Sequence, residues 1–287
     1  MPATPSVYKL VDVRFRYPGG PPVIDGLTAT AHAGRVTAVI GPNAAGKSTL
    51  LKLMLGQLKP DRGEIALEGE PLEIIPRSTR AAWVSYVPQA SRIGFAFTVR
   101  EVVAMGRYAV ADAPGVLEKM LEEMGLIDIA DRPYMELSGG QQQRVLVARA
   151  LGQVAAKDQA FQAGSCNGLS VEQAPPGTSG GRAMLLDEPV AAMDLAHAHR
   201  TMDRLRREAE RGLAVLVVLH DLNLAARYAD DVWLIDGGRA VTSGRWSDVL
   251  RADVLEPVYG VDVRQVDTDE AGRPTLRVDL AASESER

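Results

Sequence analysis

The stretch that decides the fold of this 287-residue chain is Gly41-Pro42-Asn43-Ala44-Ala45-Gly46-Lys47-Ser48-Thr49. It fits the pattern G-x-x-x-x-G-K-[ST] and lies between an apolar run, 35–40, and a segment with Leu and Met at helical spacing, 50–58. The N–H groups of such a loop and the positive end of the following helix bind phosphate. We therefore expect residues 41–49 to bind nucleotide, with Lys47 at the β- and γ-phosphates and Ser48 at Mg²⁺. The alternative is a glycine-rich turn without a ligand.

The pattern around this loop indicates an α/β fold with a parallel sheet. Buried strands are predicted at 183–186 and 214–219, and the helix between them, 195–209, begins after Asp194 and stops at Gly212. This alternation of strand and helix is typical of a parallel sheet covered by helices. Other patterns are an alternating strand at 11–17, a mostly helical stretch at 89–153 and a hairpin at 233–241.

One segment fits no periodic pattern. Residues 154–182 are rich in Gly, Ser and Pro, so we expect a surface insertion or mobile loop there. The single cysteine, Cys166, lies within it, with no second ligand nearby to suggest a metal site.

Composition excludes several classes of protein. The chain is 46% hydrophobic and 24% charged, with a net charge of −5 and a pI near 5.5, so no bulk positive charge is offered to nucleic acid. One cysteine excludes an internal disulfide framework. The longest apolar run, 213–219, is far shorter than the roughly 20 residues that cross a bilayer, and residues 1–17 contain no signal-peptide pattern. These features predict a soluble, intracellular protein.

Two further motifs complement the phosphate loop. Asp187 and Glu188 follow a buried strand, where a carboxylate can hold Mg²⁺ and its neighbour can act as a general base. Alone, such an acidic pair often marks a solvated strand end. Leu137-Ser138-Gly139-Gly140-Gln141 predicts a second helix start suited to a phosphate, with Ser138 as N-cap. A second anion-binding helix start is easiest to explain if two sites face each other across a dimer.

With these motifs in order, the chain resembles the ATP-binding subunits of ATP-binding-cassette (ABC) transporters from about Val7 to Val263, apart from residues 154–182. The resemblance rests on the phosphate loop, Gln89 within Tyr86-Val87-Pro88-Gln89, the Leu-Ser-Gly-Gly-Gln signature, Asp187-Glu188, Asp194, and His220 after a buried strand. It implies a P-loop NTPase fold with an antiparallel β subdomain, a RecA-like core and an inserted helical subdomain. The implied divisions are an ATP-binding domain at 1–265, with its helical subdomain at about 89–153, and a C-terminal tail at 266–287.

The resemblance also implies ATP and Mg²⁺ as cofactors and a role for each motif residue. Glu188 is the catalytic base, His220 holds the γ-phosphate and the water, and Lys47 stabilises phosphate charge. Tyr17 stacks on adenine, and Gln89 links the Mg²⁺ and water site to a transmembrane partner. The remaining implied residues are Ser138, Gly139, Gly140, Gln141 and Asp194 for ATP of the other protomer, and Ser48, Gln89 and Asp187 for the metal.

Taken singly, several of these residues have simpler interpretations. Tyr17 could end an amphipathic strand, and His220 could be a hydrogen-bonded core histidine. His197 and His199 stand two residues apart on a predicted helix, so they share no face and make poor metal ligands.

Two residues depart from the family pattern. Ala44 occupies a loop position that is usually glycine, and alanine there would cost about 1 kcal/mol if the backbone needs a positive φ. Ala191 replaces the usual leading serine of Ala191-Ala192-Met193-Asp194, which puts one hydrogen bond across the dimer in doubt.

The resemblance extends to a transport class. The run 95–107, together with Asp194-Leu195-Ala196-His197 and residues 220–226, resembles the iron-chelate, haem and cobalamin group of bacterial importers, most closely its haem (hemin) members. The implied partners are a second copy of this subunit, two permease subunits and, indirectly, a periplasmic substrate-binding protein, with the chain peripheral on the cytoplasmic face of the inner membrane.

Three alternatives stay open. The cargo could be an iron-siderophore or cobalamin, or the chain could be a soluble ABC ATPase acting on nucleic acid or ribosomes, although it has neither heptads nor a second phosphate loop. It could also be a regulatory cassette that does not hydrolyse ATP, against which Lys47, Glu188 and His220 argue.

Overall fold

The computed structural model describes residues 4–90, 94, 96–107, 115–163 and 183–280 of the chain, with side chains left out at 155–163. Its centre is a six-stranded sheet in the order β10-β9-β3-β8-β7-β6. The strands of this sheet are β3 (Val36–Ile40), β6 (Val84–Val87), β7 (Ala183–Asp187), β8 (Ala214–Val218), β9 (Asp231–Asp236) and β10 (Arg239–Arg245). All run parallel except β10, which pairs antiparallel with β9.

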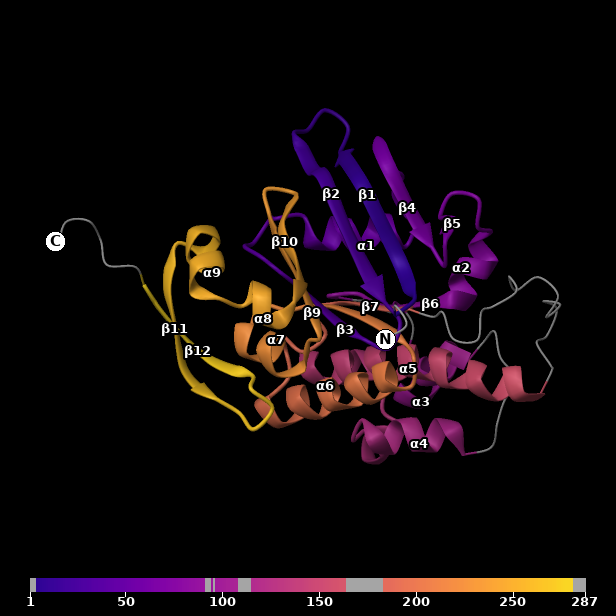
Figure 1. Ribbon diagram of the computed structural model, residues 1–287. Helices are drawn as coiled ribbons and strands as arrows, with labels where there is room; N and C mark the ends of the chain where they lie inside the picture. Colours follow the sequence, from indigo (N-terminus) through magenta and orange to yellow (C-terminus); the bar gives the residue numbers. More distant parts are fainter. Residues whose placement is uncertain (1–3, 91–93, 95, 108–114, 164–182, 281–287) are drawn as a thin grey trace.

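A second sheet lies above the first in the view of Figure 1. It is antiparallel, in the order β2-β1-β4-β5, and consists of β1 (Ser6–Arg16), β2 (Pro22–His32), β4 (Arg62–Leu67) and β5 (Glu70–Pro71). Two helices accompany it, α1 (Lys47–Met54) between the two sheets and α2 (Arg77–Trp83) at its edge. This arrangement confirms the antiparallel β subdomain that the resemblance implied.

The opposite face of the central sheet is covered by helices (Figure 1). They are α3 (Val99–Ala104), α4 (Val116–Glu123), α5 (Gly139–Ala163), α6 (Leu195–Glu210) and α7 (Leu222–Tyr228), joined in part by the short 3-10 turns 105–107, 127–129 and 134–136. The mostly helical character expected for 89–153 is confirmed for its described residues. A capping box at Thr98 and Glu101 starts α3, and the Asp194 side chain caps α6 as predicted.

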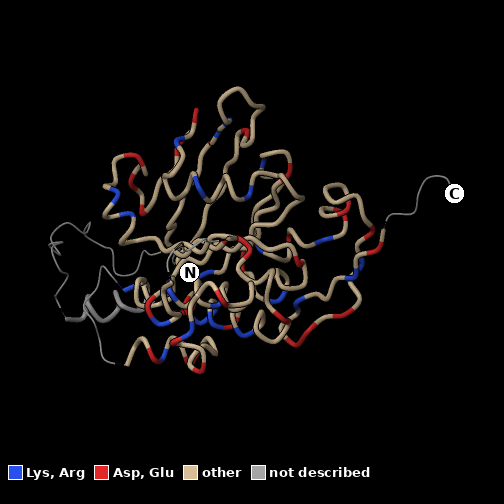
Figure 2. Tube along the Cα trace, turned by 180° about the vertical axis from the view of Figure 1, so that it is seen from behind, with Lys and Arg blue, Asp and Glu red and all other residues tan. Residues whose placement is uncertain are grey.

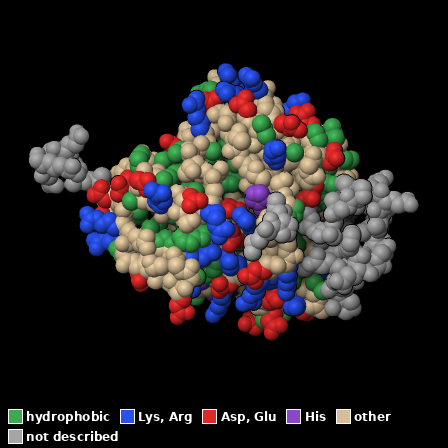
Figure 3. Space-filling view, in the orientation of Figure 1, with side chains coloured by type: hydrophobic (Ala, Val, Ile, Leu, Met, Phe, Trp, Pro, Cys, Tyr) green, Lys and Arg blue, Asp and Glu red, His purple; other side chains and the backbone are tan. Residues whose placement is uncertain are grey.

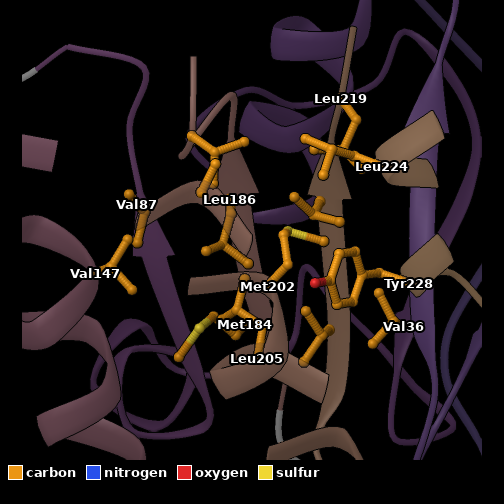
Figure 4. Packing of buried hydrophobic residues seen from close by; sticks show 14 of the residues in the cluster. Val36, Val87, Val147, Met184, Leu186, Met202, Leu205, Leu219, Leu224 and Tyr228 are labelled. Atoms are coloured by element: carbon orange, nitrogen blue, oxygen red, sulfur yellow. The ribbon is translucent and has the colours of Figure 1, made fainter. Parts of the chain in front are cut away.

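The core is divided into two layers by the sheet itself. Leu185 of β7 and Leu216 of β8 pack with α1 and the antiparallel sheet, whereas Leu186 and Val217 pack with the helices of the other face. Neighbouring residues of a strand point to opposite faces, so a continuous apolar run serves both layers. Figure 4 shows the helical layer, where Met202 and Leu205 of α6 meet Met184 and Leu186.

Acidic and basic side chains are interspersed over the described chain. Figure 2 shows the two signs mixed along the trace of both layers, and Figure 3 shows them adjacent on the surface. Among the described residues, no helix combines the length and apolar character that a bilayer crossing requires.

Two expectations about segment boundaries are corrected. Helix α5 continues to Ala163, so residues 154–163 are not part of a structureless insertion; the rest of that segment, 164–182 with Cys166, lies outside the described residues. The expected tail from 266 is largely a hairpin, β11 (Val261–Thr268) with β12 (Pro274–Leu280), which follows helices α8 (Trp246–Val249) and α9 (Ala252–Tyr259). Val263 and Leu276 of this hairpin are buried against the helical layer.

Candidate active site

The phosphate loop connects the end of β3 to the start of α1, as the sequence predicts. Gly46 is the N-cap of α1 with φ of 99°, and a Cβ there would lie 2.8 Å from the carbonyl oxygen of Val23. A side chain is therefore excluded both by backbone conformation and by space. The N-terminus of α1, with the positive end of its dipole, directly follows the loop.

Lys47 is folded over the loop that precedes it. Only 6% of the residue is exposed, and its Nζ donates hydrogen bonds to the carbonyl oxygens of Gly41 at 2.8 Å and Pro42 at 2.7 Å. Burial lowers the pKa of the Lys47 ammonium, while the nearby Glu188 and Asp187 carboxylates act in the opposite direction. The ammonium is thus held where a phosphate could replace the two carbonyls as its partner.

Ala44 has a positive φ, the backbone conformation in which alanine is less favourable than the glycine usual at this loop position. Its φ is +63°, in the left-handed region where a Cβ is unfavourable, and the residue is exposed. The cost of about 1 kcal/mol expected for alanine at a positive φ therefore applies to this loop.

Asp187, at the end of β7, has the surroundings of a cation ligand. It is 3% exposed, and its Oδ1 has no hydrogen-bond partner among the described residues. Burial raises the pKa of this carboxyl, a hydrogen bond with Ser48 lowers it, and the charge of Glu188 raises it further. An unpartnered buried carboxylate oxygen beside a hydroxyl is a donor set that suits Mg²⁺. The residues present therefore fit the metal.

Glu188 is the centre of a hydrogen-bonded group. Its Oε1 lies 2.6 Å from Nε2 of His220, and its Oε2 accepts a hydrogen bond of 2.9 Å from Nε2 of Gln89. Its φ of +52° places a non-glycine residue in the left-handed region, a strain that proteins keep mainly at functional sites.

The topology of the sheet brings this group together. Strands β3, β6, β7 and β8 are parallel, so the segments that follow them lie at the same edge. Those segments carry the phosphate loop, Gln89, Glu188 and His220 in turn. Ligands of parallel α/β sheets bind at this carboxyl edge.

The Leu-Ser-Gly-Gly-Gln segment opens α5, and Figure 1 shows that helix on the face opposite α1. Ser138 and Gln141 cap the helix reciprocally: the Gln141 N–H donates to Ser138 Oγ at 3.3 Å, and the Ser138 N–H donates to Gln141 Oε1 at 3.0 Å. Ser138 is thus the N-cap, as predicted. Its own backbone N–H is already hydrogen-bonded to Gln141. The structure does not bring this segment to the phosphate loop of the same chain.

The loop before α6 packs against the signature. A Cβ at Gly140 would lie 2.5 Å from the carbonyl oxygen of Ala192, so glycine permits this contact. Gly139 lies at an ordinary distance from the same residue. Both Asp194 carboxylate oxygens are bound to His197, one by its backbone N–H at 2.9 Å and one by its Nδ1 at 2.8 Å.

Tyr17 lies beside the helix that follows the phosphate loop. Its hydroxyl is 3.3 Å from Oγ1 of Thr49, and its ring meets Phe15 edge-on at 5.0 Å between centroids. The residue is 38% exposed, so one part of the ring is available for contact with a flat ligand.

Sequence reasoning missed two residues that contact the site. Gln143 of α5 donates to the backbone oxygens of Gln89 and Glu188. Tyr259, at the end of α9, is hydrogen-bonded to the backbone of Gly41, and burial raises the pKa of its phenol to about 12. The sequence signal for Gln143 is its proximity to the signature, two positions after Gln141. No local pattern indicates Tyr259, which lies more than 200 positions from Gly41.

Comparisons with known proteins place this geometry in context. The family profile described as ABC transporter matches residues 24–156. The Hemin import ATP-binding protein HmuV of Pseudomonas entomophila is 38% identical over 262 residues, 90% of this chain and 94% of that protein. The HmuV protein of Pseudomonas putida is 40% identical over 248 residues, 85% of this chain and 89% of that protein.

Solved structures show the same fold. The ATP binding subunit of an ABC transporter matches with a TM-score of 0.70 and 24% identity, covering 88% of this chain and 98% of that chain. A putative metal-chelate type ABC transporter, in an inward-facing conformation, matches with a TM-score of 0.70 and 24% identity over 96% of this chain and 97% of that chain.

Proposed function

This chain belongs to the ATP-binding subunits of ABC transporters, ATPases coupled to transport, and from that premise we propose that it energises the uptake of hemin. The cargo rests on the relatives named as hemin import proteins, which match this chain along most of its length. The ATP-site residues contact nucleotide rather than cargo. Iron-siderophore and cobalamin uptake are therefore the outcomes against which hemin must be tested.

The hydrolytic role rests on one observation, the placement of Glu188 between Gln89 and His220 at the edge that carries the phosphate loop. A water molecule attacks the γ-phosphorus while the bond to the ADP oxygen breaks, and Glu188 accepts the proton of that water. His220 orients the carboxylate through Oε1. Each carboxylate oxygen has one partner in the structure and a second lone pair, so Glu188 can take up the proton with both contacts in place.

The phosphate loop and Lys47 stabilise the negative charge of the phosphates. The N–H groups at the start of α1 and the ammonium of Lys47 stabilise the phosphate oxygens, and Tyr17 contacts the adenine. Asp187 and Ser48 would hold Mg²⁺, which supplies further positive charge there when bound. Gln89 would offer its Oε1 to the cation, while its Nε2 donates to Glu188.

We propose a homodimer, which the position of the signature supports. Helix α1, which follows the phosphate loop, and helix α5, which begins at the signature, cover opposite faces of the central sheet (Figure 1), and this separation favours two nucleotides shared between two copies over one nucleotide shared within a chain. In the proposed dimer, Ser138, Gly139, Gly140 and Gln141 of one copy meet ATP on the loop of the other, with Asp194 beside the seam. Two nucleotides then hold two copies together, and hydrolysis releases them.

The remaining partners follow from transport. Two permease subunits would span the inner membrane and receive the motion of this chain through the surface near Gln89. This chain would be peripheral on the cytoplasmic side. A periplasmic binding protein would deliver the cargo. The helical part of the ATP-binding domain is proposed at about 89–153.

Exchange of Glu188 for Gln tests the hydrolytic role. The variant should bind ATP and accumulate as a dimer on gel filtration, while phosphate release falls by about a hundredfold or more, the range for loss of a general base. A Glu188→Gln chain that turns over near the wild-type rate would remove Glu188 from this role.

The cargo is tested separately. Cells that produce this chain together with its permease subunits should take up hemin in preference to cobalamin or a ferric siderophore. Preferential uptake of either competitor would correct the cargo while leaving the ATPase assignment intact.

A further inference from the structure

The inference concerns Gln143, a buried side chain on α5 that none of the motifs includes. The residue is 6% exposed, and its Nε2 donates to the backbone oxygen of Gln89 at 2.9 Å and lies 3.5 Å from that of Glu188. One amide therefore contacts two segments that follow neighbouring parallel strands, β6 and β7.

The segments that carry Gln89 and Glu188 must keep a fixed separation for the two side chains to stay in contact. The side chains of Gln89 and Glu188 are themselves joined by a hydrogen bond of 2.9 Å. The turn at Glu188 has a strained φ of +52°, which surrounding contacts must maintain. The amide of Gln143 supplies such a contact from outside the turn, because it comes from a helix rather than from either strand.

We propose that Gln143 is a positioning residue for ATP hydrolysis, holding Gln89 and Glu188 at the separation that the base requires. The proposal rests on the function given above for Glu188. Gln143 stands on the helix that begins with Ser138 and Gln141, the segment placed at the partner's nucleotide. The side chain of Gln143 therefore links a displacement of this helix to the base of the chain's own site.

A purely structural role is the competing explanation, and α5 offers a matched comparison. Gln153 of the same helix also donates through Nε2 to two backbone oxygens, those of Ala81 at 2.7 Å and Val84 at 3.3 Å. Its partners lie at α2 and the start of β6, away from Glu188. Loss of the Gln153 amide removes the same kind of contact without touching the site.

The test compares Gln143→Met with Gln153→Met in the full-length chain, by phosphate release over a range of ATP concentrations. We expect kcat to fall about tenfold for Gln143→Met, which corresponds to about 1.4 kcal/mol in the barrier. The KM for ATP should stay within about twofold, because the hydrogen bonds of the Gln143 side chain go to Gln89 and Glu188 and not to the phosphate loop. Gln153→Met should keep kcat within about twofold of wild type.

A second variant keeps the test decisive if Gln143→Met folds poorly. Gln143→Asn retains an amide one methylene shorter, so we expect a folded chain with kcat between those of wild type and Gln143→Met. Equal kcat values for the Gln143 and Gln153 variants, or a loss confined to KM, would overturn the proposal. Absence of hydrolysis by the wild-type chain with its permease would instead overturn the proposed function.

Discussion

Replacement of Ala44 by Gly should stabilise the protein, although it removes a side chain. The φ of Ala44 is +63°, and a Cβ in that region costs about 1–2 kcal/mol relative to glycine. Glycine also gives the unfolded chain more freedom, which costs about 0.4–1 kcal/mol. The difference leaves a gain of about 0.5–1 kcal/mol in the free energy of unfolding. Because Ala44 is exposed, no buried methyl group is lost.

Urea unfolding of the ligand-free chain measures this gain. With a slope of about 3 kcal/mol/M, the midpoint should rise by about 0.2–0.3 M, and the melting temperature by about 2 °C. Ala45→Gly is the adjacent control, because Ala45 is buried and is not among the residues with positive φ. That exchange should cost about 1–2 kcal/mol through a lost methyl contact and added chain entropy. If Ala44→Gly destabilised the chain as Ala45→Gly does, the left-handed conformation assigned to Ala44 would be refuted.

Two further exchanges test the packing and the titration of the site. Gly140→Ala should lower the free energy of unfolding by about 1–3 kcal/mol, because the new Cβ would lie 2.5 Å from the Ala192 carbonyl oxygen; Gly139→Ala, with 3.7 Å to its nearest neighbour, should be near neutral in the same denaturation experiment. Tyr259→Phe should remove a phenol that titrates at about pH 12 in the 295 nm absorbance of the wild-type chain. Since the folded pKa is raised above the unfolded value of about 10, the wild-type chain should lose stability as the pH rises from 10 to 12, and the variant should lose less.

The central sheet could be predicted from sequence because its signals are local. Strands β3, β7 and β8 are continuous apolar runs, and both faces of each are buried. Helix α6 alternates buried and exposed residues with helical spacing after its Asp194 cap. These patterns require no knowledge of the distant chain, so they correspond closely to the observed elements.

The two boundary errors have different physical causes. Residues 154–163 contain Ala, Lys and Gln, all strong helix formers, but the Gly- and Pro-rich composition that follows obscured this propensity. The hairpin at 261–280 buries few side chains, among them Val263 and Leu276, so its apolar alternation is weak. It is attached by tertiary bonds that no local pattern reveals: the Asn223 side chain exchanges two hydrogen bonds with the backbone of Leu276.

The contacts within the site could not be predicted from local residue patterns, because they join residues far apart in the sequence. Glu188 meets Gln89 across 99 positions and His220 across 32. Periodicity can place each residue at the end of a strand, but only the order of the strands decides that these ends are neighbours. The resemblance to a family supplied that information.

The two helix starts proposed to bind phosphate, finally, support the proposed dimer and the role proposed for Gln143. Helices α1 and α5 cover opposite faces of one sheet, and in the proposed dimer a nucleotide on the loop of one chain meets the start of α5 in the other copy. The loop and the group around Glu188 lie at one sheet edge, whereas the signature lies at the end of a helix. The side chain of Gln143 leaves α5 for that edge and connects the two by hydrogen bonds to the backbone of Gln89 and Glu188. Whether nucleotide at one site alters hydrolysis at the other should accordingly depend on this amide.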